Sequence, residues 1–261
     1  MEHAPEVVQL CDQIRRFIRA EVDPRSRAIE ESDEVPPDLI QKARDLGLFG
    51  LTIPEEYGGI GLDLAGKCAV EEEMGKTNYG FATLIGNHTG ISTTGIVAIG
   101  NAAQKQKYLP RMATGEWIGA FALTEPQAGS DPAALRTRAV RKGDRYILDG
   151  EKIYITNAGL AQVFTVMAIT DHSKGIKGIS AFIVERDFPG FGIGKNELKM
   201  GMHGCTTAPL AFTGCEVPAE NLLGAEGMGY VQALKTLTAG RVTVSARCCG
   251  IMDKLLSLIH I

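Results

Sequence analysis

The spacing of apolar residues divides this chain into three parts. Over residues 5–22, apolar side chains recur at helical intervals between charged ones, and residues 37–47 and 101–116 show the same pattern. Residues 1–117 are therefore predicted to form a helical N-terminal domain, interrupted by the glycine-rich turn EEYGGIGLD.

From about Ile118, short runs rich in β-branched residues replace the helical spacing. Turns separate these runs, which are VFTVMAIT, ISAFIVE and PLAFTGCEVP. This pattern predicts a compact antiparallel β-barrel or sandwich over residues 118–222. Helical spacing returns at Gly227, so residues 223–261 are predicted to begin a C-terminal helical bundle. The expected fold class is therefore multi-domain α+β, with an all-α domain, a middle β domain and the first helix of a bundle.

The helical pattern at the C-terminus runs to the last residue without a cap. A helix that stops inside its own pattern indicates that its packing partners lie in further sequence. The final residues LSLIHI, 256–261, resemble one reading frame of a sequencing adapter, and we expect them to be an artefact at which the reading frame was cut. A natural apolar helix end is the alternative.

Composition and charge narrow the class of protein. The 261 residues carry a net charge of −4 without a basic run, which argues against nucleic acid as a partner. No stretch approaches the roughly 18–20 apolar residues of a membrane span, and the acidic N-terminus is unlike a targeting peptide, so we expect a bacterial cytoplasm in preference to a mitochondrial matrix. The six cysteines lack paired spacing and are expected to be buried thiols, and the five histidines form no metal-binding motif.

The stretch ALTEPQAGSDPAA, residues 122–134, concentrates hydroxyl, acidic, proline and glycine residues. Pro126 has no amide proton and Gly129 permits backbone conformations closed to other residues, so the stretch is predicted to be a shaped loop, with a simple linker as the alternative. The run GLDLAGKC is similar to a phosphate-binding P-loop, but it has Cys68 where a hydroxyl must reach Mg²⁺. A P-loop is therefore excluded.

Several motifs in register resemble the acyl-CoA dehydrogenase family. They are QKQKYLPRMATGEWIGAFALTEP, ALTEPQAGSDPAA, GEKIYITNA and VPAENLLGAEGMGY, and the similarity covers residues 5–255. In that family a helical domain, a β domain and a helical bundle enclose FAD and an acyl-CoA thioester. The resemblance implies an FAD-dependent enzyme that introduces an α,β double bond into acyl-CoA and passes the electrons to an electron-transfer flavoprotein.

The resemblance also assigns residues of the loop to the cofactor. Phe121, Leu123 and Thr124 would line the flavin, with the Thr124 hydroxyl toward its pyrimidine edge. Gly129 and Ser130 would let the backbone approach the FAD pyrophosphate and the substrate, with Ser130 contacting both. Hydroxyl groups on a rigid scaffold are suited to tuning a flavin, because they donate hydrogen bonds to its ring atoms.

Three further residues follow from the same resemblance. Tyr154, where many relatives have tryptophan, would pack on the flavin ring, and Thr156 would reach the flavin N5. Arg241 would hold the CoA end of the substrate, although Thr238 replaces an aspartate often found near it. An ordinary surface ion pair is the alternative for Arg241.

The catalytic glutamate is expected outside this chain. Relatives carry it late in the C-terminal bundle or just before the arginine matched by Arg241, where this chain has Gly240. The base is therefore expected beyond residue 255, this fragment is expected to be inactive, and the full-length enzyme is expected to be a dimer or tetramer. Two alternatives stay open, a flavin oxidase or monooxygenase of the same architecture and a non-catalytic acyl-CoA-binding fragment.

Overall fold

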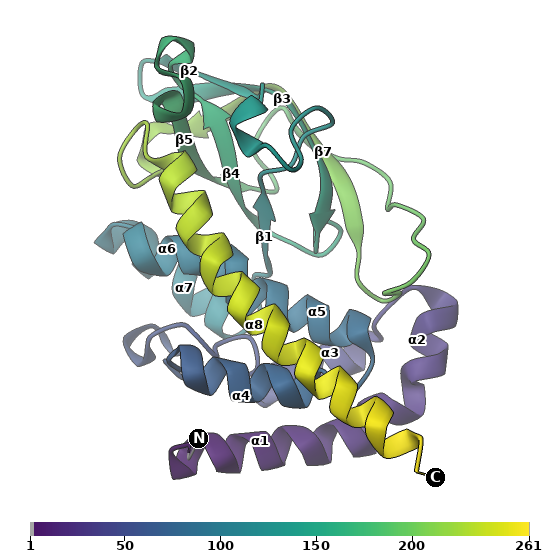
Figure 1. Ribbon diagram of the computed structural model, residues 1–261. Helices are drawn as coiled ribbons and strands as arrows, with labels where there is room; N and C mark the ends of the chain where they lie inside the picture. Colours follow the sequence, from purple (N-terminus) through teal and green to yellow (C-terminus); the bar gives the residue numbers. More distant parts are fainter. Residues whose placement is uncertain (1–2, 261) are drawn as a thin grey trace.

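The computed structural model describes residues 3–260 and places a group of helices beside a β-sheet (Figure 1). Helix α1, Pro5–Phe17, has a proline in its first turn and continues into a π-helical turn at Ile18–Val22, as the apolar spacing predicts. The other elements of the helical part are the short turns Asp23–Arg25, Glu55–Tyr57 and His88–Ser92 and the helices α2 (Ser26–Ser32), α3 (Pro37–Asp45), α4 (Leu64–Met74), α5 (Tyr79–Asn87), α6 (Thr93–Ile99) and α7 (Ala102–Ala113).

Polar side chains determine where several helices begin. At the start of α4, Asp63 Oδ1 accepts a hydrogen bond of 2.8 Å from the Gly66 amide. At the start of α7, Asn101 and Gln104 each accept from the other's backbone amide, at 2.8 and 3.0 Å. These contacts satisfy amide groups that have no partner within the helix, so the helix starts are set by local sequence.

An eight-stranded sheet forms the middle part of the molecule. Its order is β6-β7-β3-β2-β4-β5-β8, and β1 pairs with β4. Most pairs are antiparallel, as predicted, but β1 and β4 run parallel, as do β2 and β4 where they meet. The strands are β1 (Gly119–Ala122), β2 (Arg138–Lys142), β3 (Arg145–Thr156), β4 (Val163–Ile169), β5 (Ile179–Glu185), β6 (Phe191–Ile193), β7 (Thr207–Pro218) and β8 (Leu222–Leu223).

Strand β4 is buried on both faces. Since successive side chains of a strand point to opposite faces, Phe164 and Val166 enter a core within the sheet, whereas Val163 and Met167 enter a core shared with α6, α7 and α8. This two-sided burial explains why β4 is a continuous apolar run rather than an alternating one.

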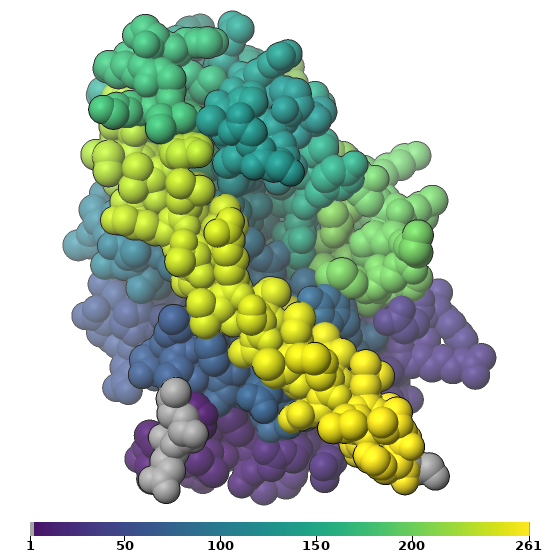
Figure 2. Space-filling model, in the orientation of Figure 1, coloured from purple at the N-terminus to yellow at the C-terminus, as the bar shows by residue number. Residues whose placement is uncertain are grey.

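Helix α8, Gly229–Leu258, crosses from the sheet to the N-terminal helices (Figure 1). A Cβ atom on Gly250 would lie 1.8 Å from the Glu72 carbonyl oxygen, and one on Gly75 would lie 2.2 Å from the Arg247 carbonyl oxygen. Glycine at these positions therefore permits the close packing of α8 on α4. Figure 2 shows that the outer surface of α8 is uncovered, and several apolar side chains are exposed on it.

Within residues 3–260, no helix is long and apolar enough to cross a membrane, and no group of three or more His, Cys, Asp or Glu side chains is placed to hold a metal ion. All six cysteines are free thiols. The expectation that they are buried is wrong for Cys248 and Cys249, because these two lie on the exposed surface of α8.

Candidate flavin and acyl-CoA site

A cavity of about 530 Å³ lies between the loop after β1, the end of β3 and helix α8, and we call it the loop cavity. The structure brings together here every residue that the sequence assigned to the cofactor or the substrate. Those residues are Phe121, Leu123, Thr124, Gly129, Ser130, Tyr154, Thr156 and Arg241. The sequence thus predicted residues of three separate segments that share one cavity.

A buried carboxylate shapes the loop after β1. Glu125 accepts hydrogen bonds from Lys152 Nζ at 2.6 Å and from the amides of Arg136 and Thr137 at 2.6 and 3.1 Å. Lys152 Nζ also donates to the Leu123 carbonyl at 3.1 Å. Burial alone raises the pKa of Glu125, but the Lys152 ammonium and the amide donors outweigh burial and hold this pKa below its usual 4.5. The stretch is therefore a fixed loop, as predicted, rather than a linker.

Lys152 was not singled out from the sequence. It is fully buried in β3, and burial lowers its pKa to about 8 even though Glu125 favours the charged form. The sequence could have identified Lys152, because it occupies an inward position of an alternating strand, and a lysine buried there must find an anionic partner.

Tyr154 projects from an irregular point of β3. The register with β7 shifts between Lys152 and Ile155, and Tyr154 has a left-handed backbone with φ of 56°. Its side chain is 62% exposed although the residue belongs to a strand. A non-glycine residue rarely adopts this conformation, so the bulge redirects an aromatic ring to the cavity at a cost in backbone strain.

The polar groups of the loop cavity have unused hydrogen-bonding capacity. Among the described residues, the hydroxyls of Thr124, Ser130 and Thr156 have no hydrogen-bond partner, and the Arg241 guanidinium has no acidic partner. A Cβ atom on Gly129 would meet nothing within 4 Å, so the backbone there faces open space. This lining fits a flavin nucleotide and its anionic substrate. It combines free hydroxyl groups, an exposed aromatic ring, the apolar side chains of Phe121 and Leu123, and a cation without an acidic partner.

His88 fixes the start of β1 against the helices. Its Nδ1 accepts from the Gly119 amide at 2.9 Å, and its Nε2 donates to the Met112 carbonyl at 3.0 Å. Burial lowers the pKa of His88 to about 4. His88 is therefore a neutral structural residue that positions the strand leading into the loop.

Helix α8 contributes a wall of the cavity that the sequence revealed only in part. Tyr230, Leu234, Leu237 and Arg241 all line the loop cavity. Their spacing of four, three and four residues places them on one helical face. The sequence could have predicted this shared face from the spacing alone. Only Arg241 was identified from the sequence.

Two smaller cavities continue from the loop cavity beneath α8. The middle cavity, about 370 Å³, shares Thr156 and Arg241 with the loop cavity. The inner cavity, about 140 Å³, shares Gly90, Gly240 and Thr243 with the middle cavity. A ligand bound near Thr156 therefore has space to extend under the helix.

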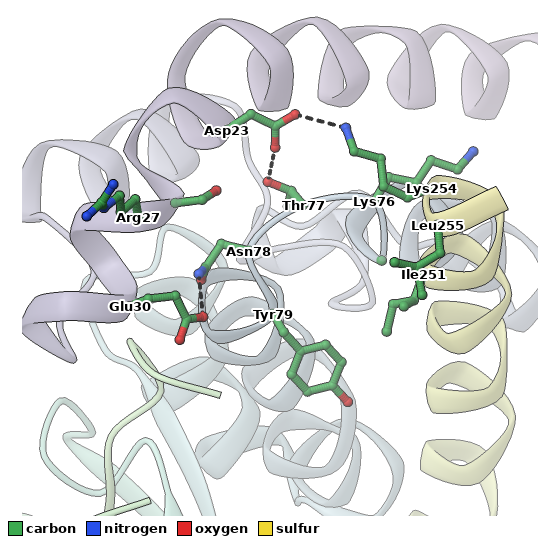
Figure 3. Close-up of a pocket in the computed structure, with 12 residues that line it drawn as sticks. Asp23, Arg27, Glu30, Lys76, Thr77, Asn78, Tyr79, Ile251, Lys254 and Leu255 are labelled. Atoms are coloured by element: carbon green, nitrogen blue, oxygen red, sulfur yellow. Dashed lines mark hydrogen bonds and ion pairs between the residues drawn. The ribbon is translucent and has the colours of Figure 1, made fainter. Parts of the chain in front are cut away.

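A separate hollow of about 570 Å³ lies near the C-terminal end of α8 (Figure 3). Asp23 accepts hydrogen bonds from Thr77 at 2.6 Å and from Lys254 at 3.5 Å, while Asn78 donates to Glu30 at 3.1 Å. The contact between Lys254 and Asp23 links α8 to the N-terminal helices. None of the residues predicted to bind FAD or CoA lines this hollow.

Comparisons with known proteins agree with this geometry. Residues 4–116 match the profile of the acyl-CoA dehydrogenase N-terminal domain, and residues 120–215 match that of the middle domain. An acyl-CoA dehydrogenase of Bacillus subtilis (strain 168) is 41% identical over 98% of this chain and 68% of its own length. A short-chain specific acyl-CoA dehydrogenase of Clostridium acetobutylicum is 42% identical over 92% of this chain and 63% of its own length.

Solved structures show the same fold. One described as the electron transferring flavoprotein of Acidaminococcus fermentans has a TM-score of 0.95 and 42% identity, over 98% of this chain and 68% of that chain. A prolyl acyl carrier protein oxidase, AnaB, has a TM-score of 0.93 and 32% identity over the same shares.

The chain belongs to the acyl-CoA dehydrogenase family, whose members are FAD-dependent oxidoreductases that act on CH–CH bonds. The family identification and the order of helical, β and helical parts predicted from the sequence are confirmed. The chain spans 63 to 68% of the length of the two curated relatives described above.

Proposed function

We propose that this chain is part of an enzyme that dehydrogenates an acyl-CoA thioester to the trans-2-enoyl-CoA with FAD. The observation that carries the proposal is the meeting of all eight assigned residues in the loop cavity, with hydroxyl groups and a guanidinium that lack partners. When bound, FAD supplies the acceptor for the hydride that leaves the β-carbon. Electrons then pass to an electron-transfer flavoprotein, the name carried by one structural relative.

Each side chain has a stated task in this proposal. Thr124 and Thr156 donate hydrogen bonds to the flavin ring, and Tyr154 packs against that ring. The open backbone at Gly129 and the hydroxyl of Ser130 meet phosphate and substrate oxygens.

Arg241 is proposed to hold an anionic part of CoA at the opposite wall of the loop cavity. It is exposed, and it lines both the loop cavity and the middle cavity, so an ester extending under α8 would pass it. The absence of an acidic partner within residues 3–260 favours this role over the surface ion pair that was the alternative.

The catalytic base is proposed to lie beyond residue 255 of a longer protein. Among the residues that line the loop and middle cavities, the one carboxylate within the described part of the chain is Asp131, which accepts a hydrogen bond of 3.0 Å from the Ala133 amide. Gly240 offers no side chain.

The same proposal includes three further points. The chain is divided into residues 1–117, 118–222 and 223–261, the full-length enzyme is an oligomer, and it is located in a bacterial cytoplasm.

A flavin oxidase is the second candidate, and the similarity to the oxidase AnaB favours keeping it. The two candidates differ in what reoxidises the flavin. In the complete enzyme, reoxidation by an electron-transfer flavoprotein that is much faster than reoxidation by air supports the dehydrogenase, and the reverse supports the oxidase.

Binding of FAD tests the site itself. FAD titrated into the chain should show quenched fluorescence, and Thr156→Val should weaken binding about 2- to 10-fold, the scale of one hydrogen bond of about 0.5–1.5 kcal/mol. Thr156→Ser keeps the hydroxyl and is the matched control. Equal affinity of all three proteins would remove Thr156 from the flavin site, and no FAD binding at all would contradict the proposed cofactor site.

A further inference from the structure

A cluster of buried charged side chains joins α4 to α8 beside the inner cavity. Glu71 lies 2.9 Å from Lys67 Nζ and accepts from Arg247 Nε at 2.8 Å and from Arg247 Nη2 at 2.5 Å. Arg247 also donates to Thr83 Oγ1 at 3.1 Å, and Lys67 donates to Thr89 Oγ1. Lys67 and Glu71 are each 2% exposed, and Arg247 is 4% exposed.

The charges of this cluster do not cancel, since it holds two cations and one carboxylate. Glu73, the other buried acid of α4, is already paired with Arg15 and Lys76, at 2.8 and 3.0 Å. Asp63 lines the inner cavity, but it is exposed to solvent and accepts from the Gly66 amide. Burial lowers the pKa of Lys67. Its charged form leaves the buried part with one excess positive charge, which is costly unless an anion compensates it.

The excess charge faces space in which a ligand can sit. Lys67 and Thr89 line the inner cavity, and Arg247 and Thr83 line the middle cavity. An ammonium has three donors, and the described residues supply Lys67 with two acceptors, the Glu71 carboxylate and the Thr89 hydroxyl. One donor of a fully buried lysine thus remains for a ligand.

Glycines keep the route to this charge open. Gly90 and Gly240 line both the middle and the inner cavity, and a Cβ atom on Gly90 would meet nothing within 4 Å. A Cβ atom on Gly86 would lie 1.7 Å from Arg247 Nη2, so glycine there makes room for the guanidinium. The cavities run from Thr156, near the proposed flavin position, toward Lys67.

We propose that the inner cavity receives an anionic end of the acyl group, so that the enzyme selects CoA thioesters whose acyl chain ends in a carboxylate. This inference rests on the proposed function, because it assumes that an acyl-CoA enters beneath α8. A terminal carboxylate would accept the free donor of Lys67 and neutralise the excess charge. A purely apolar chain end would leave both unsatisfied.

The test compares thioesters that differ only at the distal end. Binding of adipoyl-CoA, its neutral monomethyl ester and hexanoyl-CoA to the FAD-loaded chain is measured by titration calorimetry. We expect adipoyl-CoA to bind at least tenfold more tightly than the other two, which corresponds to about 1.4 kcal/mol. Equal binding of the three esters, or a preference for hexanoyl-CoA, would overturn the inference while leaving the proposed function intact.

Variants separate recognition from structural support. Lys67→Met should lose the preference for adipoyl-CoA and retain or gain affinity for hexanoyl-CoA, whereas the exposed Lys177→Met should behave like the wild type. An equal loss for both esters in a folded Lys67→Met protein would make Lys67 structural and contradict the inference. If that variant fails to fold, the wild-type comparison decides alone.

Two further outcomes have defined meanings. Free adipate that binds as tightly as adipoyl-CoA would identify a site for small carboxylates and overturn the assignment to an acyl group. Failure of the FAD-loaded wild type to bind any of the CoA esters would contradict the proposed function, and the inference with it.

Discussion

At the scale of single residues, Glu125 holds the cofactor loop in shape. It is buried with Lys152, and its remaining acceptor capacity is used by the amides of Arg136 and Thr137. Replacing one partner of a buried ion pair leaves the other charge uncompensated, which is costlier than losing the pair as a whole. The loop that presents Thr124 to the cavity therefore depends on a residue that does not line the cavity.

Glu125→Gln should lower the free energy of unfolding by about 3–5 kcal/mol at neutral pH, because Lys152 would lose its counter-ion and must then stay buried as an unpaired cation or give up its proton. Urea unfolding measures the change. Glu216→Gln, which removes a half-exposed partner of Arg145, is the control and should cost about 1 kcal/mol or less. A loss in Glu125→Gln no larger than in the control would contradict the role of the ion pair.

The same variant has a pH signature. Because the pKa of Glu125 lies below 4.5 in the folded state, its carboxylate contributes stability above that pH, and this contribution is lost as the pH falls through the folded-state pKa. The stability difference between wild type and Glu125→Gln should therefore shrink as the pH falls below about 4.5. A difference that keeps growing as the pH falls below 4.5 would be inconsistent with a lowered pKa of Glu125.

Arg241→Ala should raise the dissociation constant of the FAD-loaded chain for butyryl-CoA about fivefold, because an exposed ion contact contributes about 1 kcal/mol. Raised salt should weaken wild-type binding more than that of the variant. Arg138→Ala, an exposed arginine of β2 that does not line the cavity, is the control. Unchanged affinity in Arg241→Ala would make this residue part of the ordinary surface.

At the scale of elements, helix α8 forms one wall of three cavities and is held against α4 by glycine contacts. The backbone of α8 approaches α4 at Gly250 and Gly75 so closely that no side chain fits between them. Because Arg241 and Gly240 belong to the same helix, this contact contributes to their position beside the cavities. The position of the site is thus set partly by packing at a distance from it.

Gly250→Ala should lower the free energy of unfolding by about 1–3 kcal/mol, because the added methyl group would meet the Glu72 carbonyl oxygen and push α8 away from α4. Alanine favours a helix over glycine by at most about 1 kcal/mol, which does not offset the clash. Ser245→Ala, an exposed change on the same helix, is the control. A Gly250→Ala protein as stable as the wild type in urea would show that the helices can separate without cost.

At the scale of the whole molecule, the uncovered surface of α8 and the cavity lining point to the same conclusion. Val231, Val242 and Met252 on this helix are exposed, although such residues on a long helix normally pack against neighbours. Within residues 3–260, the lining of the loop cavity includes no carboxylate free of hydrogen bonds within the chain. Both observations are consistent with a site that further sequence completes.

The 261-residue chain should therefore bind FAD without carrying out the reaction. Butyryl-CoA added anaerobically to the FAD-loaded chain should leave the flavin absorbance near 450 nm unbleached, because no base is placed to remove the α-proton. The related Bacillus subtilis acyl-CoA dehydrogenase is a suitable comparison protein. Rapid, stoichiometric bleaching would place the base within these residues and contradict the proposal of a base beyond residue 255.

The sequence by itself determined the local features of this protein. Proline and side-chain caps define helix starts, apolar spacing separates helices from strands, and Pro126 and Gly129 identify the loop, because these effects act between residues close in the chain. The family motifs also supplied eight of the residues that line the loop cavity. That assignment required no knowledge of which segments touch.

Only the tertiary structure decided what depends on contacts between distant segments. Two buried ion pairs, Glu125 with Lys152 and Glu71 with Arg247, join residues from different elements, and no spacing rule predicts them. The strained bulge at Tyr154 likewise depends on the register of β3 against β7. Burial makes these contacts obligatory, since a charge removed from water must find a partner wherever the fold places one.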